Sequence, residues 1–413
     1  MDILRFITAG SVDDGKSTLI GRLLYDSKSI LSDQLQAIRR QSRKDSALEI
    51  DLALLTDGLR AEREQGITID VAYKYFSTAK RKFIIADAPG HTQYTRNMVT
   101  GASTANLALI LIDARNGIME QTRRHSILAS LLGIPHVVVC VNKMDLVDFS
   151  EDRFYEIVNN FRPIAGKLGL KDVYYVPVSA RLGDHIVDRS PHMPWFTGKP
   201  LLPYLEELPL SSDINLEIAR MPVQYVIRPQ SRELHDYRGF AGKIISGSFH
   251  SGQAVRIYPG GEETTISRIE TFDGILEQAS APLSVVLHLT DDLGVGRGDL
   301  IVPRDQPIHF GQDFQATICW MDTAPLKVGD RLILQHNCNS VRCSIREIPY
   351  RIDVGSLEQL PAGGSVGLNE IFCASIHTAK PIAWDQYQDN RANGGFILIQ
   401  ENTNVTVGAG MIL

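Results

Sequence analysis

The feature that most constrains the fold is the segment Gly10–Ser17, which reads GSVDDGKS and matches the pattern GxxxxGK[ST]. It lies between an apolar run that predicts a strand and the helix-like run TLIGRLL. Its glycines permit a tight path whose N–H groups form an anion nest at a helix N-terminus. Lys16 would neutralise the β- and γ-phosphates, and the Ser17 hydroxyl would ligate Mg²⁺. The context therefore favours a phosphate-binding loop over a glycine-rich turn without a ligand.

Up to about Leu208, short apolar runs alternate with longer amphipathic stretches, which predicts an α/β domain, a mostly parallel sheet with helices on both faces. Five runs are predicted strands: ILRFITA from Ile3, KFIIAD from Lys82, LALILID from Leu107, HVVVCVN from His136 and VYYVPVS from Val173. Strands this continuously apolar are buried on both faces. The polar stretch from Ser27 to Glu64 has helical propensity, and we interpret it as an insertion.

The pattern changes after a proline-rich passage that ends near Pro209. Short alternating strands separated by Gly and Pro turns follow, with PVQYVIR, RGFAGKIISGSF, AVRIYPGG and SVVLHL as the clearest. A second change near Pro307 begins the strands DFQATICW, DRLILQ, SVGLNEIFCAS and GGFILIQ. We predict a P-loop GTPase domain over residues 1–212, followed by two small β-barrels over residues 213–306 and 307–413.

Composition excludes several classes of protein. No run of about 18 uncharged apolar residues predicts a membrane helix, and the first strand starts too early for a secretory signal. The five cysteines are scattered without CxxC spacing, so we expect reduced core thiols. A net charge of −6 gives no basic footprint for non-specific nucleic-acid binding, although a shape-specific RNA stays open. We therefore expect a cytoplasmic protein with no membrane or DNA partner.

The second motif, Asp87-Ala88-Pro89-Gly90-His91, follows the KFIIAD strand at the carboxyl end of the predicted sheet, where α/β folds bind ligands. Asp87 is expected to hold Mg²⁺ through water, and the Gly90 N–H is expected to sense the γ-phosphate. His91 is the predicted residue that positions the attacking water. A solvent-facing loop histidine is the alternative.

The third motif, Asn142-Lys143-Met144-Asp145, follows the HVVVCV strand. The Asp145 carboxylate can accept hydrogen bonds from the N1–H and the exocyclic amino group of guanine, which adenine cannot supply. A site built around such donors rejects analogues by on the order of 10⁴. The predicted base is therefore guanine, with Ser179-Ala180 completing the pocket through backbone contact.

Thr68, in the run GITI, is the candidate switch threonine for Mg²⁺ and the γ-phosphate, against the alternative of an ordinary strand-edge threonine. No intrinsic arginine finger can be named, so slow unassisted turnover and an activating partner are expected.

The predicted site residues fall into three overlapping groups. Catalytic roles go to His91, Lys16 and Thr68, and metal ligation goes to Ser17, Thr68 and Asp87. The predicted GTP-binding residues are Gly10, Ser11, Val12, Asp13, Asp14, Gly15, Lys16, Ser17, Thr18, Asp87, Ala88, Pro89, Gly90, His91, Asn142, Lys143, Met144, Asp145, Ser179 and Ala180.

The ordered set GSVDDGKS, GITI, DAPGH, NKMD and SA, followed by two β-barrels, resembles the translation-factor class of GTPases across the whole chain. Longer runs narrow the resemblance: GSVDDGKSTLIGRLLYD, GITIDVAYKYFSTAKRKFIIADAPGHTQYTRNM, QTRRHSILASLLGI, YRGFAGKIISG and NRANGGFILIQENTNVTVGAGMI. They are similar to the large, GTPase subunit of bacterial sulfate adenylyltransferase, including Asp14 where elongation factors carry His or Ser.

The resemblance implies a subunit whose Mg²⁺-dependent GTP hydrolysis drives a catalytic partner in sulfate assimilation. The partner is a small subunit of the ATP-pyrophosphatase type, which makes adenosine 5′-phosphosulfate and pyrophosphate from ATP and sulfate, so a heterodimer is expected. Since no second GxxxxGK[ST] occurs in the sequence, a fused adenylylsulfate kinase is not expected in it.

Two other functions stay open. An elongation-factor-like GTPase that delivers aminoacyl-tRNA would have the same three-domain layout, although the resemblance does not favour a tRNA partner. A GTP-binding regulatory module with negligible hydrolysis is the third hypothesis.

Overall fold

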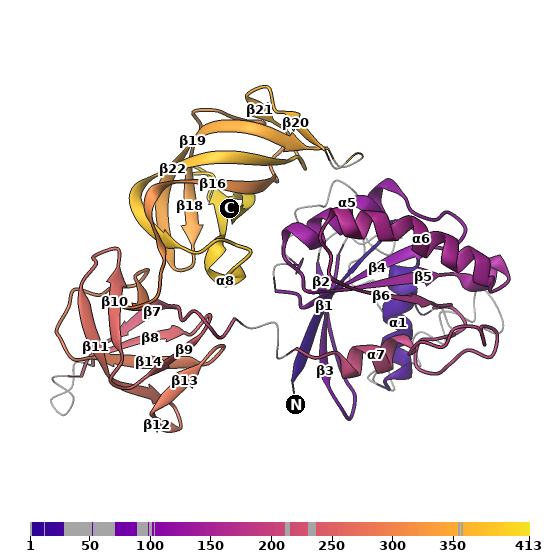
Figure 1. Ribbon diagram of the computed structural model, residues 1–413, viewed down its shortest axis with the longest axis horizontal. Coiled ribbons are helices and arrows are strands. Elements are labelled where there is room, and N and C mark those ends of the chain that lie inside the picture. Colours follow the sequence, from indigo (N-terminus) through magenta and orange to yellow (C-terminus); the bar gives the residue numbers. More distant parts are fainter. Residues whose placement is uncertain are drawn as a thin grey trace. The chain divides into compact units, whose positions relative to one another are not determined.

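The computed structural model describes residues 2–11, 13–28, 52, 71–88, 98, 101–102, 104–210, 215–229, 237–353, 356 and 358–413. The chain divides after Leu210 into two compact units, an α/β unit and a unit that contains both barrels. Figure 1 shows the two kinds of architecture. The predicted insertion from Ser27 to Glu64 lies almost entirely outside the described residues.

The α/β unit is built on a six-stranded sheet with the order β2-β3-β1-β4-β5-β6. Its strands are β1 (Ile3–Ala9), β2 (Ala72–Ser77), β3 (Lys82–Asp87), β4 (Leu107–Asp113), β5 (His136–Asn142) and β6 (Asp172–Pro177). All pairs are parallel except β2 with β3. The five predicted strands are confirmed. The sequence reading missed β2, because Lys74 and Ser77 leave no continuous apolar run in AYKYFS.

Helices cover both faces of this sheet. Helix α1 (Lys16–Asp26) and helix α7 (Leu201–Glu207) share a core with side chains of β1 and β4 on one face, for example Leu19 and Leu201 with Leu109. Helix α5 (Glu120–Leu131) and helix α6 (Glu151–Lys167) lie on the other face (Figure 1). A short 3₁₀ helix, η3 (Met144–Val147), follows β5.

The first barrel contains β7 (Met221–Ile227), β8 (Gly239–Lys243), β10 (Ala254–Tyr258), β11 (Glu263–Thr271), β14 (Ser284–Leu289) and β15 (Leu300–Pro303). Its sheet order is β10-β15-β7-β8-β14-β11-β12, and the pairing of β10 with β11 closes it. Strand β12 (Gly274–Leu276) extends one hairpin, and β9 (Ser248–His250) pairs with β13 (Gln278–Ser280).

The predicted run RGFAGKIISGSF is not one strand but two, β8 and β9, in different sheets. Gly247, between them, has φ 65°, and a Cβ there would lie 2.3 Å from the Ala219 Cα. Strand β8 ends at Lys243, and at Gly247 the chain passes close to the backbone of Ala219, an approach that glycine permits.

The second barrel contains β16 (His309–Trp320), β18 (Arg331–His336), β19 (Asn339–Ile352), β22 (Ile371–Trp384), β23 (Gly395–Ile399) and β24 (Thr406–Ile412). Its order is β18-β23-β24-β16-β22-β19-β20, closed by the pairing of β18 with β19. The minor elements are β17 (Leu326–Lys327), β20 (Gln359–Pro361), β21 (Ser365–Val366) and α8 (Arg391–Gly394). The predicted fold class, an α/β domain followed by two β-barrels, is confirmed; the limits at residues 212 and 306 stay predictions.

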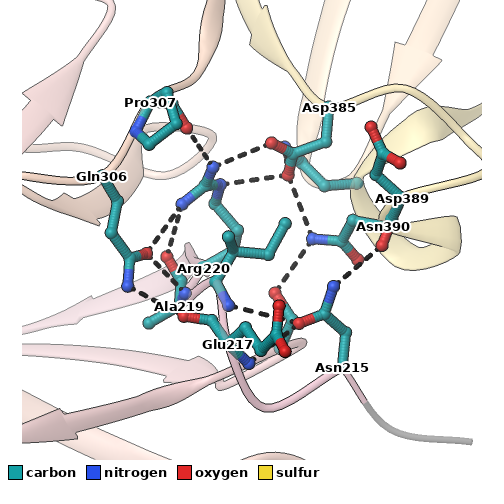
Figure 2. Close-up of polar contacts among 12 residues, drawn as sticks. Asn215, Glu217, Ala219, Arg220, Gln306, Pro307, Asp385, Asp389 and Asn390 are labelled. Atoms are coloured by element: carbon teal, nitrogen blue, oxygen red, sulfur yellow. Dashed lines mark hydrogen bonds and ion pairs between the residues drawn. The ribbon is translucent and has the colours of Figure 1, made fainter.

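The two barrels share a buried polar cluster around Arg220, which we call the Arg220 junction (Figure 2). Arg220 is 0% exposed, and its Nε and Nη2 atoms lie 3.0 and 2.8 Å from the two carboxylate oxygens of Asp385. The guanidinium also donates to the carbonyls of Ala219 and Pro307 and to the side chain of Gln306. All five guanidinium N–H groups therefore have acceptors within the protein.

The carboxylate of Asp385 is satisfied in the same way. It also accepts hydrogen bonds from Asn390 at 3.0 Å and from Asn393 at 2.9 Å. Asn390 reaches back to the first barrel through Ser246 Oγ at 2.9 Å. The junction is thus a closed network of ions and amides that binds the start of one barrel to the end of the other.

No helix of the described chain has the length and apolarity that a membrane crossing requires. All five cysteines are free thiols, and four of them are buried: Cys140, Cys319, Cys343 and Cys373.

Candidate nucleotide site

The loop Gly10–Ser17 connects β1 to α1, as predicted from the sequence. Two of its residues, Asp13 (φ 69°) and Gly15 (φ 91°), have left-handed backbone conformations. A Cβ on Gly15 would lie 2.5 Å from Asn142 Nδ2, so no side chain fits there without a shift. No side chain caps helix α1. The first-turn N–H groups are therefore available to an anion. Val12 lies outside the described residues.

Lys16 begins α1 and is 8% exposed. Within the described part of the chain, its ammonium group forms no ion pair or hydrogen bond. The Asp14 carboxyl interacts with the ammonium electrostatically but forms no ion pair with it. A buried cation with so little compensation is costly, so the geometry suits a site that receives a negatively charged group. Ser17 and Thr18, which follow it on the first turn of α1, are half-buried.

Asp14 is a buried carboxyl within the loop, 2% exposed, and its Oδ2 accepts the Ser11 N–H at 2.5 Å. Burial raises the pKa of Asp14 to about 6, although the Ser11 hydrogen bond opposes this rise. The nearby carboxylate of Asp113 raises the pKa further, and the Lys16 ammonium lowers it. Asp14 therefore titrates much closer to neutral pH than an exposed aspartate.

Asn142 and Lys143, at the end of β5, bind the loop through its carbonyls. Asn142 Nδ2 donates to the Asp14 carbonyl at 2.8 Å, and Asn142 Oδ1 accepts the Ala180 N–H at 3.0 Å. The Lys143 ammonium donates to the Asp13 carbonyl. Three motifs that are separate in sequence are thus joined by direct hydrogen bonds.

Asp145 and Ser179 form the next contact. The Ser179 hydroxyl donates to Asp145 Oδ1 at 2.7 Å, and Ser179 Oγ also accepts the Leu182 N–H at 3.2 Å. This contact orients the half-buried Asp145 carboxylate and leaves its second oxygen available as an acceptor. Met144 and Ala180, which neighbour these two residues in sequence, are both buried.

Asp87 ends β3 beside the loop and is 2% exposed. Its Oδ1 accepts the Thr8 hydroxyl at 3.1 Å, and the strand register places the two residues opposite each other. Ala88 is also buried. The other predicted site residues lie outside the described part of the chain: Thr68, Pro89, Gly90 and His91.

Sequence reasoning missed Asp113, which is 1% exposed at the end of β4. Lys143 Nζ lies 3.0 Å from its carboxylate, and Arg115 Nη2 lies 2.7 Å from it. Burial alone would raise the pKa of Asp113, but the hydrogen bonds from Arg115 and Lys143 prevail and lower it to about 2. The signal was present, because Asp113 ends its strand just as Asp87 does.

Sequence reasoning also missed Arg22, on α1. Its Nε donates to the Ala180 carbonyl at 3.0 Å, and its guanidinium also contacts the Arg181 carbonyl. Helix α1 therefore holds both the phosphate loop and the segment after β6. The site combines an uncapped helix N-terminus, a buried lysine and an oriented carboxylate acceptor at one edge of the sheet. This arrangement suits a phosphate-bearing ligand whose other end carries hydrogen-bond donors.

Comparison with known proteins identifies related sequences along the chain. The family model of the elongation factor Tu GTP binding domain matches residues 1–226, and that of the GTP-eEF1A C-terminal domain-like family matches residues 313–413. Sulfate adenylyltransferase subunit 1 of Chromobacterium violaceum is 52% identical over 415 residues, which cover 100% of this chain and 86% of that protein.

Two further comparisons concern a longer protein and a solved structure. The bifunctional enzyme CysN/CysC of Mycobacterium tuberculosis (strain CDC 1551 / Oshkosh) is 49% identical over 412 residues, which cover 100% of this chain and 67% of that protein. The crystal structure of Sup35 complexed with GDP is 23% identical, with a TM-score of 0.45, and the match covers 100% of this chain and 94% of that one.

The name of the Chromobacterium relative describes one subunit of an enzyme. Its similarity extends over the α/β unit and both barrels alike, and the N-terminal half matches a GTP-binding family besides. The chain therefore belongs to the sulfate adenylyltransferase subunit 1 family, whose N-terminal domain is of the elongation factor Tu GTP-binding type.

Proposed function

We propose that this chain is the GTP-binding and GTP-hydrolysing subunit of a sulfate adenylyltransferase. Its GTP hydrolysis drives a partner catalytic subunit, of the small ATP-pyrophosphatase type, to form adenosine 5′-phosphosulfate and pyrophosphate from ATP and sulfate. The observation that carries the proposal is the joined site: Asn142 binds both the phosphate loop and the segment at Ala180, in a chain 52% identical to a sulfate adenylyltransferase subunit 1.

The described residues divide between the two ends of GTP. The loop N–H groups and the Lys16 ammonium would bind the phosphates. The Asp145 carboxylate, oriented by Ser179, would accept hydrogen bonds from guanine. Asn142 and Lys143 would keep the phosphate loop and the base pocket in fixed positions.

The residues near the loop also suit Mg²⁺, which prefers oxygen ligands and retains several waters. Ser17 offers a hydroxyl on the first turn of α1, and Asp87 offers a carboxylate that the Thr8 hydroxyl keeps in place. Thr68 would complete the ligand set in the GTP state. The metal, when bound, would neutralise charge on the phosphates.

Hydrolysis is assigned to His91, which we propose orients the attacking water. The support comes from the sequence: His91 follows Asp87 by four residues, and Asp87 lies beside the phosphate loop. Because the reaction consumes ATP and GTP, we place the heterodimeric enzyme in the cytoplasm, where these nucleotides are abundant.

The test is to co-express the chain with the small subunit and measure pyrophosphate release from ATP and sulfate, with and without GTP. We expect GTP to stimulate release. Absence of stimulation by GTP would overturn the proposal.

The role of His91 has a separate test. His91→Ala should slow GTP hydrolysis by about 10² or more while GTP affinity changes little. Unchanged turnover would remove His91 from its assigned role, and negligible turnover in the unmodified chain would favour a purely regulatory module.

The second candidate is an elongation-factor-like GTPase that delivers aminoacyl-tRNA. It is favoured by the match of both ends of the chain to elongation-factor families. Filter binding separates the two functions, because tight retention of aminoacyl-tRNA that depends on GTP would support the carrier.

A further inference from the structure

The hairpin formed by β11 and β12 exposes large apolar side chains at the surface of the first barrel. Phe272, at its turn, is 105% exposed, and Ile275 is 64% exposed. Among the large apolar residues that the structure describes, Phe272 is the most exposed. We call residues 271–277 the acidic hairpin, because they include Asp273 and Glu277.

The acidic hairpin is held in one conformation. Ladder pairs join Ile269 to Leu276 and Thr271 to Gly274, and the Thr271 hydroxyl donates to the Gly274 carbonyl at 3.1 Å. Gly274 has φ 131°, a conformation that favours glycine. Leu276 packs against the barrel core and anchors the hairpin. Phe272 is therefore presented by an ordered turn, which reduces the entropy lost on binding.

The hairpin continues into a row of side chains on the outer face of the barrel. The register pairs Ile275 with Glu270, Glu270 with Val286, Val286 with Ala241, and Ala241 with Tyr225. Paired residues in adjacent strands lie on the same face, so this row crosses five strands, about 19 Å. Tyr225, at its far end, is 66% exposed. The row is an apolar surface interrupted by one carboxylate.

That carboxylate is fully engaged within the barrel. Glu270 Oε2 lies 2.9 Å from His288 Nε2 and 3.2 Å from Arg268 Nη2, and it accepts the Tyr237 hydroxyl at 3.2 Å. An apolar centre beside polar groups that already have partners is the composition of a protein interface.

The charge at the hairpin indicates what it would bind. Asp273 and Glu277 are exposed, and neither side chain has an ion pair or hydrogen bond in the described part of the chain. These carboxylates would repel the phosphates of a nucleic acid. A symmetric dimer formed through this face would bring identical carboxylates together. The complementary surface is an apolar pocket bordered by lysine or arginine.

We propose that the acidic hairpin and its row bind the catalytic partner subunit, with Phe272 inserted into an apolar pocket of that subunit and basic residues facing Asp273 and Glu277. The inference rests on the proposed function, which requires such a partner. A buried aromatic anchor surrounded by charges is typical of an interface hot spot.

The experiment measures binding of the full-length chain to the separately purified partner subunit by calorimetry. Phe272→Ser combined with Ile275→Ser should weaken the complex by about 30-fold or more. Asp273→Lys combined with Glu277→Lys should weaken it by about tenfold and reduce its dependence on salt. Tyr155→Ser, at a 42% exposed aromatic residue on α6, is the matched control and should bind as the unmodified chain does. Unchanged GTP hydrolysis and melting temperature would show that the variants are folded.

Binding of the Phe272 and Ile275 double variant within twofold of the unmodified chain would overturn the hairpin proposal alone. Failure of the unmodified chain to bind the partner would overturn the proposed function and this inference with it. Sedimentation provides the third readout: loss of a self-association, with partner binding intact, would identify the face as a dimer contact and also overturn the proposal.

Discussion

The phosphate loop and the Arg220 junction both bury a cationic side chain, but the protein completes them differently. Arg220 is 0% exposed, and all of its N–H groups have acceptors from the two barrels. Lys16 is 8% exposed, and its ammonium forms no hydrogen bond or ion pair with the described residues, although the Asp14 carboxyl interacts with it electrostatically. The backbone near Lys16 is also incomplete, because no side chain caps the N-terminus of α1.

This contrast separates structural clusters from ligand-binding clusters. Burial alone makes both sites conspicuous, whereas the supply of partners within the protein distinguishes them. In a closed network, the buried charges are neutralised by partners within the protein and contribute to the folded structure. In an incomplete network, the buried charge is left to interact with a ligand. The following changes test this distinction.

The closed network around Arg220 should be the most sensitive to mutation. Arg220→Met should lower the free energy of unfolding by about 3–5 kcal/mol, because the Asp385 carboxylate would remain buried without its partner. Urea denaturation measures this loss, and GTP affinity should stay unchanged. Arg220→Met combined with Asp385→Leu should recover part of the stability. A single-variant loss below about 1 kcal/mol would contradict a closed structural network.

Lys16→Ala tests the incomplete site. We expect GTP affinity to fall by about 100-fold, because a charge-assisted bond to phosphate contributes up to about 3 kcal/mol. Stability without nucleotide should stay the same or rise, since a buried unpaired charge is removed. Fluorescent GTP titration measures the affinity, and exposed Lys80→Ala is the matched control. If Lys16→Ala lost stability and kept its affinity for GTP, Lys16 would be a structural residue and not a ligand-binding one.

Asn142→Ala tests a residue that combines both roles, because Asn142 makes structural hydrogen bonds within the proposed ligand site. It would remove the bonds to the Asp14 carbonyl and the Ala180 N–H, at a cost of about 2 kcal/mol in stability. GTP affinity should fall by about tenfold, because the loop and the base pocket would no longer be joined. Exposed Asn159→Ala on α6 serves as the control. If Asn142→Ala and the control bind GTP equally well, Asn142 does not support GTP binding by joining the phosphate loop to the base pocket.

The smallest effect concerns pH. Burial raises the pKa of Asp14 in the folded state to about 6 from 3.8, so the folded protein binds the proton more tightly than the unfolded chain. The stability from this proton is complete below pH 3.8 and disappears as pH rises through about 6. Between pH 5 and 7.5, the loss should be about 1.4 kcal/mol. Urea denaturation should show no such loss of stability in Asp14→Asn. If the free energy of unfolding changed with pH in the same way in Asp14→Asn and in the unmodified chain, the raised pKa of Asp14 would be contradicted.

Much of the α/β fold could be predicted because its strands are buried on both faces. The runs from Leu107 and His136 are apolar except at their ends, and the structure buries every residue of β4 and β5. Strand β2 (AYKYFS) has an exposed side that carries Tyr73, Tyr75 and Ser77, and Lys74 interrupts its apolar residues, so it produced no comparable signal. The division of RGFAGKIISGSF was not predicted either, and the close approach of Ala219 at Gly247, within this run, is a contact distant in sequence that no local pattern contains.

The predicted site residues that the structure describes lie close together. Motif spacing and strand ends brought together Asp14, Asn142 and Ala180, which are joined by hydrogen bonds. Their roles in GTP binding stay predictions. The Arg220 junction could not be predicted, because Arg220 and Asp385 are 165 residues apart and neither lies in a motif. Only the packing of the two barrels creates their contact.

Closure of the barrels affects how the protein behaves at high concentration. The pairings of β10 with β11 and of β18 with β19 give each of the six ring strands in either barrel two neighbours. The described strands outside the closed rings, β9, β12, β13, β17, β20 and β21, have two or three residues each and offer little backbone for strand addition. Among the described strands of the barrels, edge-to-edge growth, a common route to fibrils and domain swapping, therefore has few starting points. Ring closure is thus a built-in protection against aggregation.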